Sequence, residues 1–214
     1  MSNQSIRSVK GTRDILPDET GYWRLLENEL HRHLSYYGYQ EIRTPAFEQT
    51  ELFARGVGKE TDIVSKEMYS WEDQGGTRLT LKPELTAPVV RAFIQHNLAS
   101  TAPLTRLYYI DALFRRERPQ KGRYRQFYQF GAEVLGSPYP EADVEIISIA
   151  YEFYKSLGLD DITLQLNSIG STESRKTYRA ALRSFLAPKA KHLSEISRNR
   201  LETNPLRILD TKIP

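Results

Sequence analysis

Two strand-like segments on either side of a short loop constrain the fold of this chain more than any other feature. Residues 107–116 and 123–135 are rich in aromatic and branched side chains, and Pro119 and Gly122 mark the segment between them as a loop. A Gly-Gly pair at 75–76 divides a second pair of such segments. Because the strands come in hairpins and do not alternate with helices, we predict an α+β fold, an antiparallel β-sheet flanked by helices.

Amphipathic segments predict the helices that cover this sheet. Leu26, Leu30 and Leu34 recur at helical spacing, and Gly38 can end their helix with a positive φ. Residues 39–50 are expected to form a strand that is interrupted at Pro45. Further helices are expected from about Thr86, with Val89, Ile94 and Leu98 inward, and over 142–158 and 171–186, and a further strand over 162–170.

The loop of the first hairpin holds most of the positive charge. The chain carries a formal +3, whereas Arg115, Arg116, Arg118, Lys121, Arg123 and Arg125 against Glu117 give the loop +5 and leave −2 for the rest. One tight cluster of cations suits a compact phosphate group or a single nucleic-acid contact. The ordinary alternative is a solvated loop.

Alternation along the returning strand separates a polar face from an apolar one. Arg125, Phe127, Gln129, Gly131 and Glu133 point one way, and Tyr128, Phe130 and Ala132 point the other. Glycine permits the close approach of a ligand, and the apolar face suits packing under helices. A polar face that ends in Gln and Glu beside arginines predicts a site for a ligand that carries both phosphate and amine.

Composition excludes several classes of protein. The chain has no cysteine, which excludes disulfides and thiolate metal sites, and its four histidines show no metal-binding spacing, so we expect no metal site. The N-terminus lacks the apolar core of an export signal, and no stretch approaches about 18 apolar residues. We therefore expect a cytoplasmic protein without a membrane contact.

Five ordered segments resemble one family. Residues 114–136, "FRRERPQKGRYRQFYQFGAEVLG", resemble motif 2 of class II aminoacyl-tRNA synthetases in the form found in histidyl-tRNA synthetases. The other four segments are "KGTRDILP", "TPAFEQTELFARGVGKETDIVSKEMYSWED", "LTLKPELTAPVVRA" and "LNSIGSTESRKTYRAAL…LETNPLRILDTK". The resemblance implies an antiparallel catalytic sheet, a homodimer, and the use of ATP and Mg²⁺ to activate L-histidine and transfer it to tRNA(His).

The resemblance also implies roles for single residues. Arg115 matches the arginine that holds the α-phosphate of ATP and stabilises the charge of the transition state, which makes it the candidate catalytic residue. Arg123 matches the arginine that engages the γ-phosphate, and Glu117 matches an acid near the adenine. Lys121, between them, lies where the family's loop meets the acceptor end of the tRNA.

Four residues match the histidine-binding positions of the family. Glu84 and Thr86 match residues that receive the α-amino group, with Gln129 assisting, and Glu133 matches the acid that faces the imidazole. Each carboxylate also has a purely structural alternative. Glu84 can cap the helix that begins near Thr86, and Glu133 can form a bridge with an arginine of the loop.

The family's later segments do not occur in this sequence. Motif 3, the second histidine-binding segment and the anticodon-binding domain belong after the point where the sequence stops. We therefore interpret the chain as an N-terminal fragment that is inactive alone. Residues 1–170 are expected to form the N-terminal part of the catalytic domain with motifs 1 and 2, and 171–214 the mostly helical start of an insertion domain.

Two other functions remain open at this point. The first is a synthetase-like regulatory subunit of the ATP phosphoribosyltransferase of histidine biosynthesis, against which the intact arginine loop argues. The second is a nucleic-acid-binding module that uses the same loop. Such a module would lose affinity steeply with ionic strength, because many of its contacts would be made to phosphates.

Overall fold

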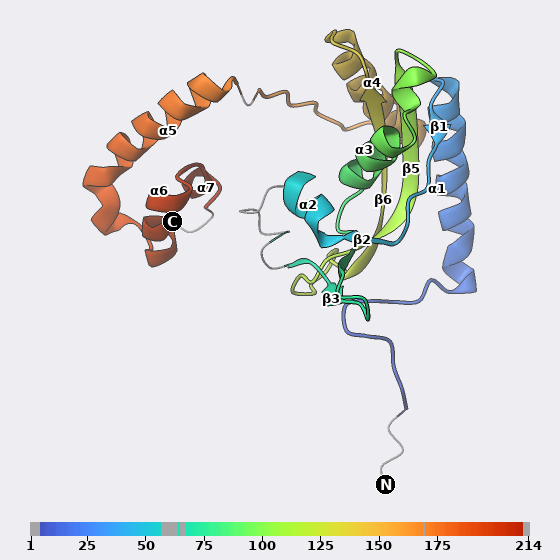
Figure 1. Cartoon of the computed structure of the whole chain (residues 1–214), viewed down its shortest axis with the longest axis horizontal. Coiled ribbons are helices and arrows are strands. Elements are labelled where there is room, and N and C mark those ends of the chain that lie inside the picture. The colour runs from blue at the N-terminus through green and yellow to red at the C-terminus, as the bar shows by residue number, and fades with distance from the viewer. Residues whose placement is uncertain (1–4, 57–63, 65–66, 169, 212–214) are drawn as a thin grey trace. The chain divides into compact units, whose positions relative to one another are not determined.

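The computed structural model describes residues 5–56, 64, 67–168 and 170–211 (Figure 1). The chain divides into two compact units, Met1–Ile162 and Thr163–Pro214. The first unit contains two clusters of buried apolar side chains, and in the second unit Leu182 and Leu201 are buried. In the described residues, no helix is long and apolar enough to cross a membrane.

The expected hairpin is the centre of the first unit. Strands β5 (Thr105–Phe114) and β6 (Gln126–Leu135) pair antiparallel over their whole length, with Tyr109 opposite Gly131. The short strand β1 (Gln40–Glu41) adds to β5 in parallel. This sheet is therefore mixed, whereas the sequence predicted antiparallel pairing alone. The parallel pair joins residues more than sixty positions apart, which no local pattern records.

A second three-stranded sheet is antiparallel throughout. Its order is β2 (Phe47–Gln49), β4 (Arg78–Leu81) and β3 (Ser70–Glu72), and β3 and β4 form the hairpin expected at the Gly-Gly pair. The chain passes from the first sheet to the second at Pro45, between β1 and β2, which confirms the predicted interruption. The fold is α+β with sheets flanked by helices, as predicted.

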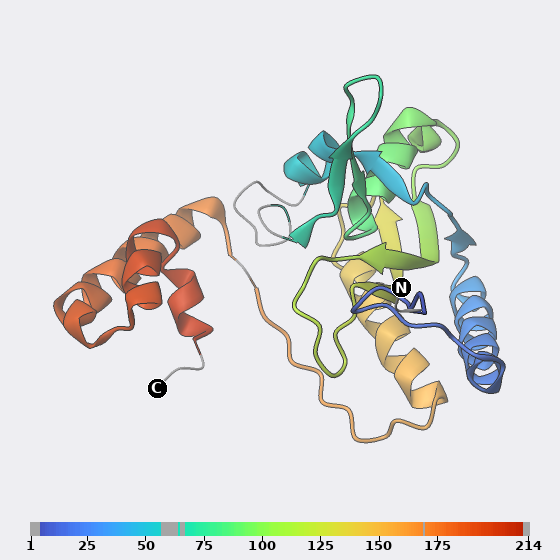
Figure 2. The same ribbon diagram turned by 90° about the horizontal axis from the view of Figure 1, so that it is seen from below.

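Two helices cover the apolar face of the central hairpin. Helix α1 (Pro17–Tyr36) and helix α4 (Glu141–Ser156) lie on the same side of β5 and β6 (Figure 2). Their buried side chains pack with Phe130 and Ala132 of β6, and include Leu30, Leu34, Ile149 and Phe153. Both helices end before a glycine with positive φ. The predicted apolar face of the strand is thus confirmed.

Helix α3 (Thr86–Gln95) lies on the opposite side of the hairpin (Figures 1 and 2). Val89 is fully buried against Tyr109 and Leu113, as predicted. The prediction for Ile94 was wrong, because its side chain is 70% exposed. Five residues separate it from Val89, which at 3.6 residues per turn places it well away from the buried face.

The remaining helices connect and complete the two units. In the first unit, α2 (Thr50–Gly56) follows β2, and η2 (Leu98–Ser100) follows α3. The second unit contains α5 (Thr172–Leu186), η3 (Ala187–His192), α6 (Glu195–Thr203) and α7 (Leu206–Leu209). Serine hydroxyls cap α5 and α6, because Ser171 accepts from the Ser174 N–H and Ser194 from the Ser197 N–H.

The strand predicted at 162–170 does not form within the described residues. Residues 162–168 are extended without a ladder, and the side chains of Leu164 and Leu166 are 53% and 71% exposed. Alternating leucines favour a strand, but a strand also needs a hydrogen-bonded neighbour, which no described segment provides here. The prediction was wrong for that reason.

Candidate functional site

Arg115 lies at the point where β5 ends and the arginine loop, residues 115–125, begins. Its Nε donates to the carbonyl oxygen of Pro83 at 2.9 Å, and its guanidinium lies over the ring of Phe127, 5.1 Å from the centroid. Its backbone N–H also donates to the carbonyl of Arg125. The side chain is 24% exposed, so it is anchored at its base while part of the guanidinium remains accessible.

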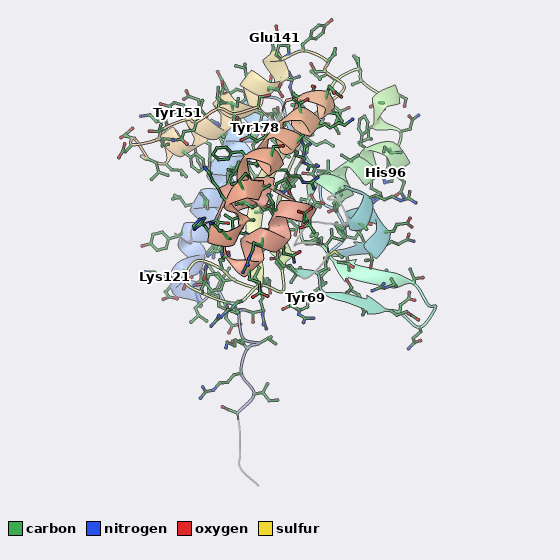
Figure 3. The ribbon with its side chains drawn as sticks, turned by 90° about the vertical axis from the view of Figure 1, so that its left-hand side faces the viewer. Tyr69, His96, Lys121, Glu141, Tyr151 and Tyr178 are labelled. Carbon is green, nitrogen blue, oxygen red and sulfur yellow. The ribbon has the colours of Figure 1, made fainter. Side chains whose placement is uncertain are left out.

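Much of the rest of the arginine loop is exposed, including Arg116, Arg118, Lys121 and Arg123. Figure 3 shows Lys121 at the end of the first unit remote from Glu141. Arg123 is 64% exposed and reaches the carboxylate of Glu117 at 3.5 Å, while Arg115 lies 4.0 Å from the other oxygen of Glu117. One acid thus lies between the two arginines that the sequence assigned to phosphate binding.

A segment near the N-terminus is bound to this loop. The Arg125 N–H donates to the Gly11 carbonyl at 2.6 Å, and its guanidinium donates to the Lys10 carbonyl at 3.2 Å. A side chain at Gly11 would meet Arg125 and Pro119 within 3 Å. Arg125 therefore holds the loop in place.

Glu84 binds the start of helix α3. Its carboxylate accepts from the backbone N–H of Thr86 at 2.8 Å and from that of Ala87 at 3.1 Å. Burial raises the pKa of Glu84, and nearby Glu133 raises it further, while the two backbone N–H groups and Arg115 act in the opposite direction. The capping alternative is therefore realised.

Glu133 lies against the same helix end. One oxygen, Oε1, accepts from the Thr86 hydroxyl at 2.8 Å and from the Tyr109 hydroxyl at 3.2 Å. In the described part of the chain Glu133 forms no ion pair with an arginine, so its bridging alternative is not realised there. The structure thus brings together Glu84, Thr86 and Glu133, and we call these three with Tyr109 the carboxylate cluster.

Gln129 lies on the same strand face as Glu133, four residues nearer to the arginine loop. Its cross-strand neighbour is Asp111. Among the described residues its side chain makes no hydrogen bond with the cluster, so the structure places it on the right face without joining it to the other three. The ring of Phe127, two residues earlier on this face, lies beneath Arg115.

An open hollow of about 610 Å³ borders the cluster between α2 and α3. Glu84 and Thr86 form one end of its wall, and Leu52, Val90 and Ile94 supply much of its apolar surface. The exposed side chain of Ile94 therefore lies in the wall of this hollow. Arg115, Gln129 and Glu133 do not line it, so it meets the predicted site only at the start of α3.

Sequence reasoning missed two features of the site. The first is Tyr109, which belongs to the carboxylate cluster. In the sequence, the one indication of this role is that Tyr109 falls opposite a glycine, which can be recognised only when the register of the hairpin is known. Lys82 is 1% exposed and pairs with Asp111 of β5, while its Nζ also donates to the Thr44 carbonyl at 3.2 Å. This ion pair joins the two sheets directly before Pro83 and Glu84.

The described residues contain no group of three or more His, Asp or Glu side chains able to hold a metal ion. The carboxylates of the cluster are already engaged by hydroxyl and backbone donors.

A family model and curated proteins match this chain. The family model described as Histidyl-tRNA synthetase matches residues 11–201. A histidine-tRNA ligase of Chloroherpeton thalassium is 54% identical over 209 residues, which cover 97% of this chain and 49% of that protein. One of Microcystis aeruginosa is 52% identical over 207 residues, with the same two coverages. The chain spans about half the length of the curated relatives it matches.

Solved structures match as well. The apo histidyl-tRNA synthetase of S. aureus has a TM-score of 0.73 at 38% identity, over 98% of this chain and 49% of that one. A Bacillus halodurans protein described as an ATP phosphoribosyltransferase regulatory subunit/histidyl-tRNA synthetase has a TM-score of 0.66 at 24% identity, over 91% and 54%. At that identity the second similarity concerns the fold alone.

Proposed function

Because the chain belongs to the histidyl-tRNA synthetase family and has its class II synthetase-like α+β fold, we propose that it supplies half of a site that activates L-histidine with ATP. In this reaction the carboxylate of histidine attacks the α-phosphorus, pyrophosphate leaves, and histidyl-adenylate forms before histidine passes to tRNA(His). The observation that carries the proposal is the carboxylate cluster next to the anchored guanidinium of Arg115 on one sheet face.

The arginine loop forms the ATP side of the proposed site. Arg115 stabilises the negative charge that develops at the α-phosphate, and its bond to the Pro83 carbonyl holds the guanidinium ready before ATP binds. Arg123 leaves its weak contact with Glu117 to bind the γ-phosphate, and Glu117 lies near the adenine. Mg²⁺ would be held mainly by the phosphate oxygens of ATP, where it would neutralise part of their negative charge.

The carboxylate cluster forms the histidine side. Glu84, Thr86 and Gln129 bind the α-ammonium group, and Glu133 accepts a hydrogen bond from the imidazole. Carboxylates suit both tasks because each histidine group is an N–H donor. The hydrogen bond from Thr86 to Glu133 links the residues for the α-ammonium group to the residue for the imidazole. The pocket is therefore partly organised before histidine binds.

The partners and domains follow from the same proposal. tRNA(His) places its acceptor end against the arginine loop near Lys121, and two copies of the protein form a homodimer in the cytoplasm. We propose that residues 1–170, which include the first unit and all of the proposed site residues, form the N-terminal part of a catalytic domain. The second unit begins the proposed insertion domain, expected at 171–214.

Histidine-dependent exchange of radiolabelled pyrophosphate into ATP by the complete product of the gene tests this function. We expect exchange with histidine and none with other amino acids. A protein that shows no exchange but binds an ATP phosphoribosyltransferase would overturn the proposal in favour of the regulatory subunit. The relatives at 52% to 54% identity, all histidine-tRNA ligases, favour the enzyme.

A further inference from the structure

Tyr109 is the member of the carboxylate cluster to which the resemblance assigned no role. Its side chain is 4% exposed and packs among Leu85, Val89 and Leu113 beneath helix α3. From this apolar setting its hydroxyl reaches Glu133 Oε1 at 3.2 Å. Burial raises the pKa of Tyr109, so its hydroxyl keeps its proton at neutral pH and donates to the carboxylate.

The hydroxyl reaches Glu133 because the residue opposite Tyr109 is a glycine. In the hairpin register Tyr109 faces Gly131, and the Tyr109 hydroxyl lies over that backbone. A Cβ atom at Gly131 would lie 2.4 Å from the Tyr109 oxygen and 2.5 Å from the ring carbon that carries it. Gly131 therefore provides the space that this side chain occupies, which is a reason for glycine in the middle of a strand.

Two donors act on a single oxygen of Glu133. Thr86 and Tyr109 both donate to Oε1, and within the described residues Oε2 accepts no hydrogen bond. A carboxylate held through one oxygen keeps a fixed orientation and can present the other oxygen to a ligand N–H group. Fixing such a group before binding reduces the entropy cost of recognition.

We propose that Tyr109 is a positioning residue that orients Glu133 to accept a hydrogen bond from the imidazole N–H of histidine, with Gly131 as its necessary neighbour. This inference rests on the proposed function of the site. Tyr109 acts through Glu133 and contributes to the choice of amino acid. The hydrogen bond of its hydroxyl goes to Glu133 and not to an arginine of the loop, so we expect Tyr109 to have no direct part in ATP binding.

Replacing Tyr109 by Phe in the complete product of the gene tests this inference. The ring remains, one hydrogen bond to a charged group is lost, and we expect the KM for histidine in pyrophosphate exchange to rise about tenfold. The KM for ATP should stay within about twofold. Gly131→Ala, which displaces the ring but keeps the hydroxyl, should produce the same selective rise.

Tyr39→Phe is the matched control. Tyr39 is equally buried, at 3% exposed, and donates to a carboxylate, Glu145, at 2.8 Å, but this pair belongs to the α1 and α4 side of the sheet. It should leave both KM values unchanged. An unchanged histidine KM in Tyr109→Phe, or equal rises for histidine and ATP, would overturn the inference alone. Absence of exchange in the unaltered protein would overturn the proposed function with it.

Discussion

The carboxylate cluster and the arginine loop meet the same strand face, but they are held very differently. In the cluster, side chains from β5, β6 and the start of α3 are joined by hydrogen bonds of 2.8 to 3.2 Å. In the loop, Arg123 is 64% exposed and its contact with Glu117 is 3.5 Å long. The proposed histidine side of the site is therefore held in place without a ligand, whereas Arg123 on the proposed phosphate side is held only weakly.

The chemistry of the two proposed ligand groups explains this difference. Histidine must be told apart from other amino acids, which requires fixed acceptors whose loss leaves buried groups unpaired. A phosphate group is recognised mainly by charge, and long arginine side chains can reach it from several conformations. Arg115 differs from Arg123, because its bond to the Pro83 carbonyl anchors it to the segment that carries Glu84.

The largest expected effect concerns the ion pair between Lys82 and Asp111, which joins the two sheets directly before Glu84. Lys82→Met leaves Asp111 without its cation, and breaking a fully buried ion pair in this way costs about 3 to 5 kcal/mol of unfolding free energy. Because the Asp111 side chain is 29% exposed, we expect a loss near the lower end of that range. Urea denaturation followed by tryptophan fluorescence measures it, because both tryptophans lie in the first unit. The control is Lys155→Met, whose partner Asp160 is 81% exposed and whose loss should cost less than about 1 kcal/mol. Equal losses of unfolding free energy in the two variants would contradict a special role for the ion pair between Lys82 and Asp111.

The next effect concerns the rate of adenylation and Arg115, which connects the arginine loop to the segment that carries Glu84. Arg115→Ala removes the anchored guanidinium, and by comparison with the loss of one oxyanion-hole donor we expect adenylation to slow on the order of 10²-fold. Pyrophosphate exchange by the complete gene product measures this. Arg116→Ala, the adjacent and exposed arginine, is the control and should stay within a few-fold of the unaltered protein. Similar losses in both variants would remove Arg115 from the mechanism.

A third prediction distinguishes the carboxylate cluster from the arginine loop by the ligand whose affinity changes. Glu133→Gln exchanges one acceptor oxygen for an N–H₂ donor in a site that accepts N–H groups, so histidine affinity should fall about tenfold. ATP affinity should change little, because the loop arginines are not touched. Calorimetric titration of each ligand separately measures the two values. Equal losses for histidine and ATP would mean that Glu133 only supports the fold.

The smallest effect is a pH dependence confined to the cluster. Burial raises the pKa of Glu84, so the folded state binds a proton more tightly than the unfolded state. The contribution of Glu84 to stability is therefore greatest in acid and falls as pH rises from its ordinary pKa through the raised one. Glu84→Gln should flatten this part of the curve of unfolding free energy against pH. A curve that stays equally steep would assign the slope to other groups.

Local patterns in the sequence predicted much of this molecule. Helix α1, the two hairpins and the face that carries Gln129 and Glu133 follow from helical spacing, turn residues and strand alternation. Two predictions of strand pairing failed because the decisive contact was distant along the chain. The alternation at 162–168 had no neighbouring strand in the described residues, and the parallel pair of β1 with β5 left no local signal.

The sequence by itself determined which residues could carry the chemistry, because an arginine cluster, a strand period of two and a family resemblance are all written along the chain. Only the tertiary structure decided which of them touch. It placed Tyr109 over Gly131, brought Thr86 against Glu133, and buried Lys82 beside Asp111. Thr86 and Glu133 are 47 positions apart along the chain, so folding alone brings these partners together.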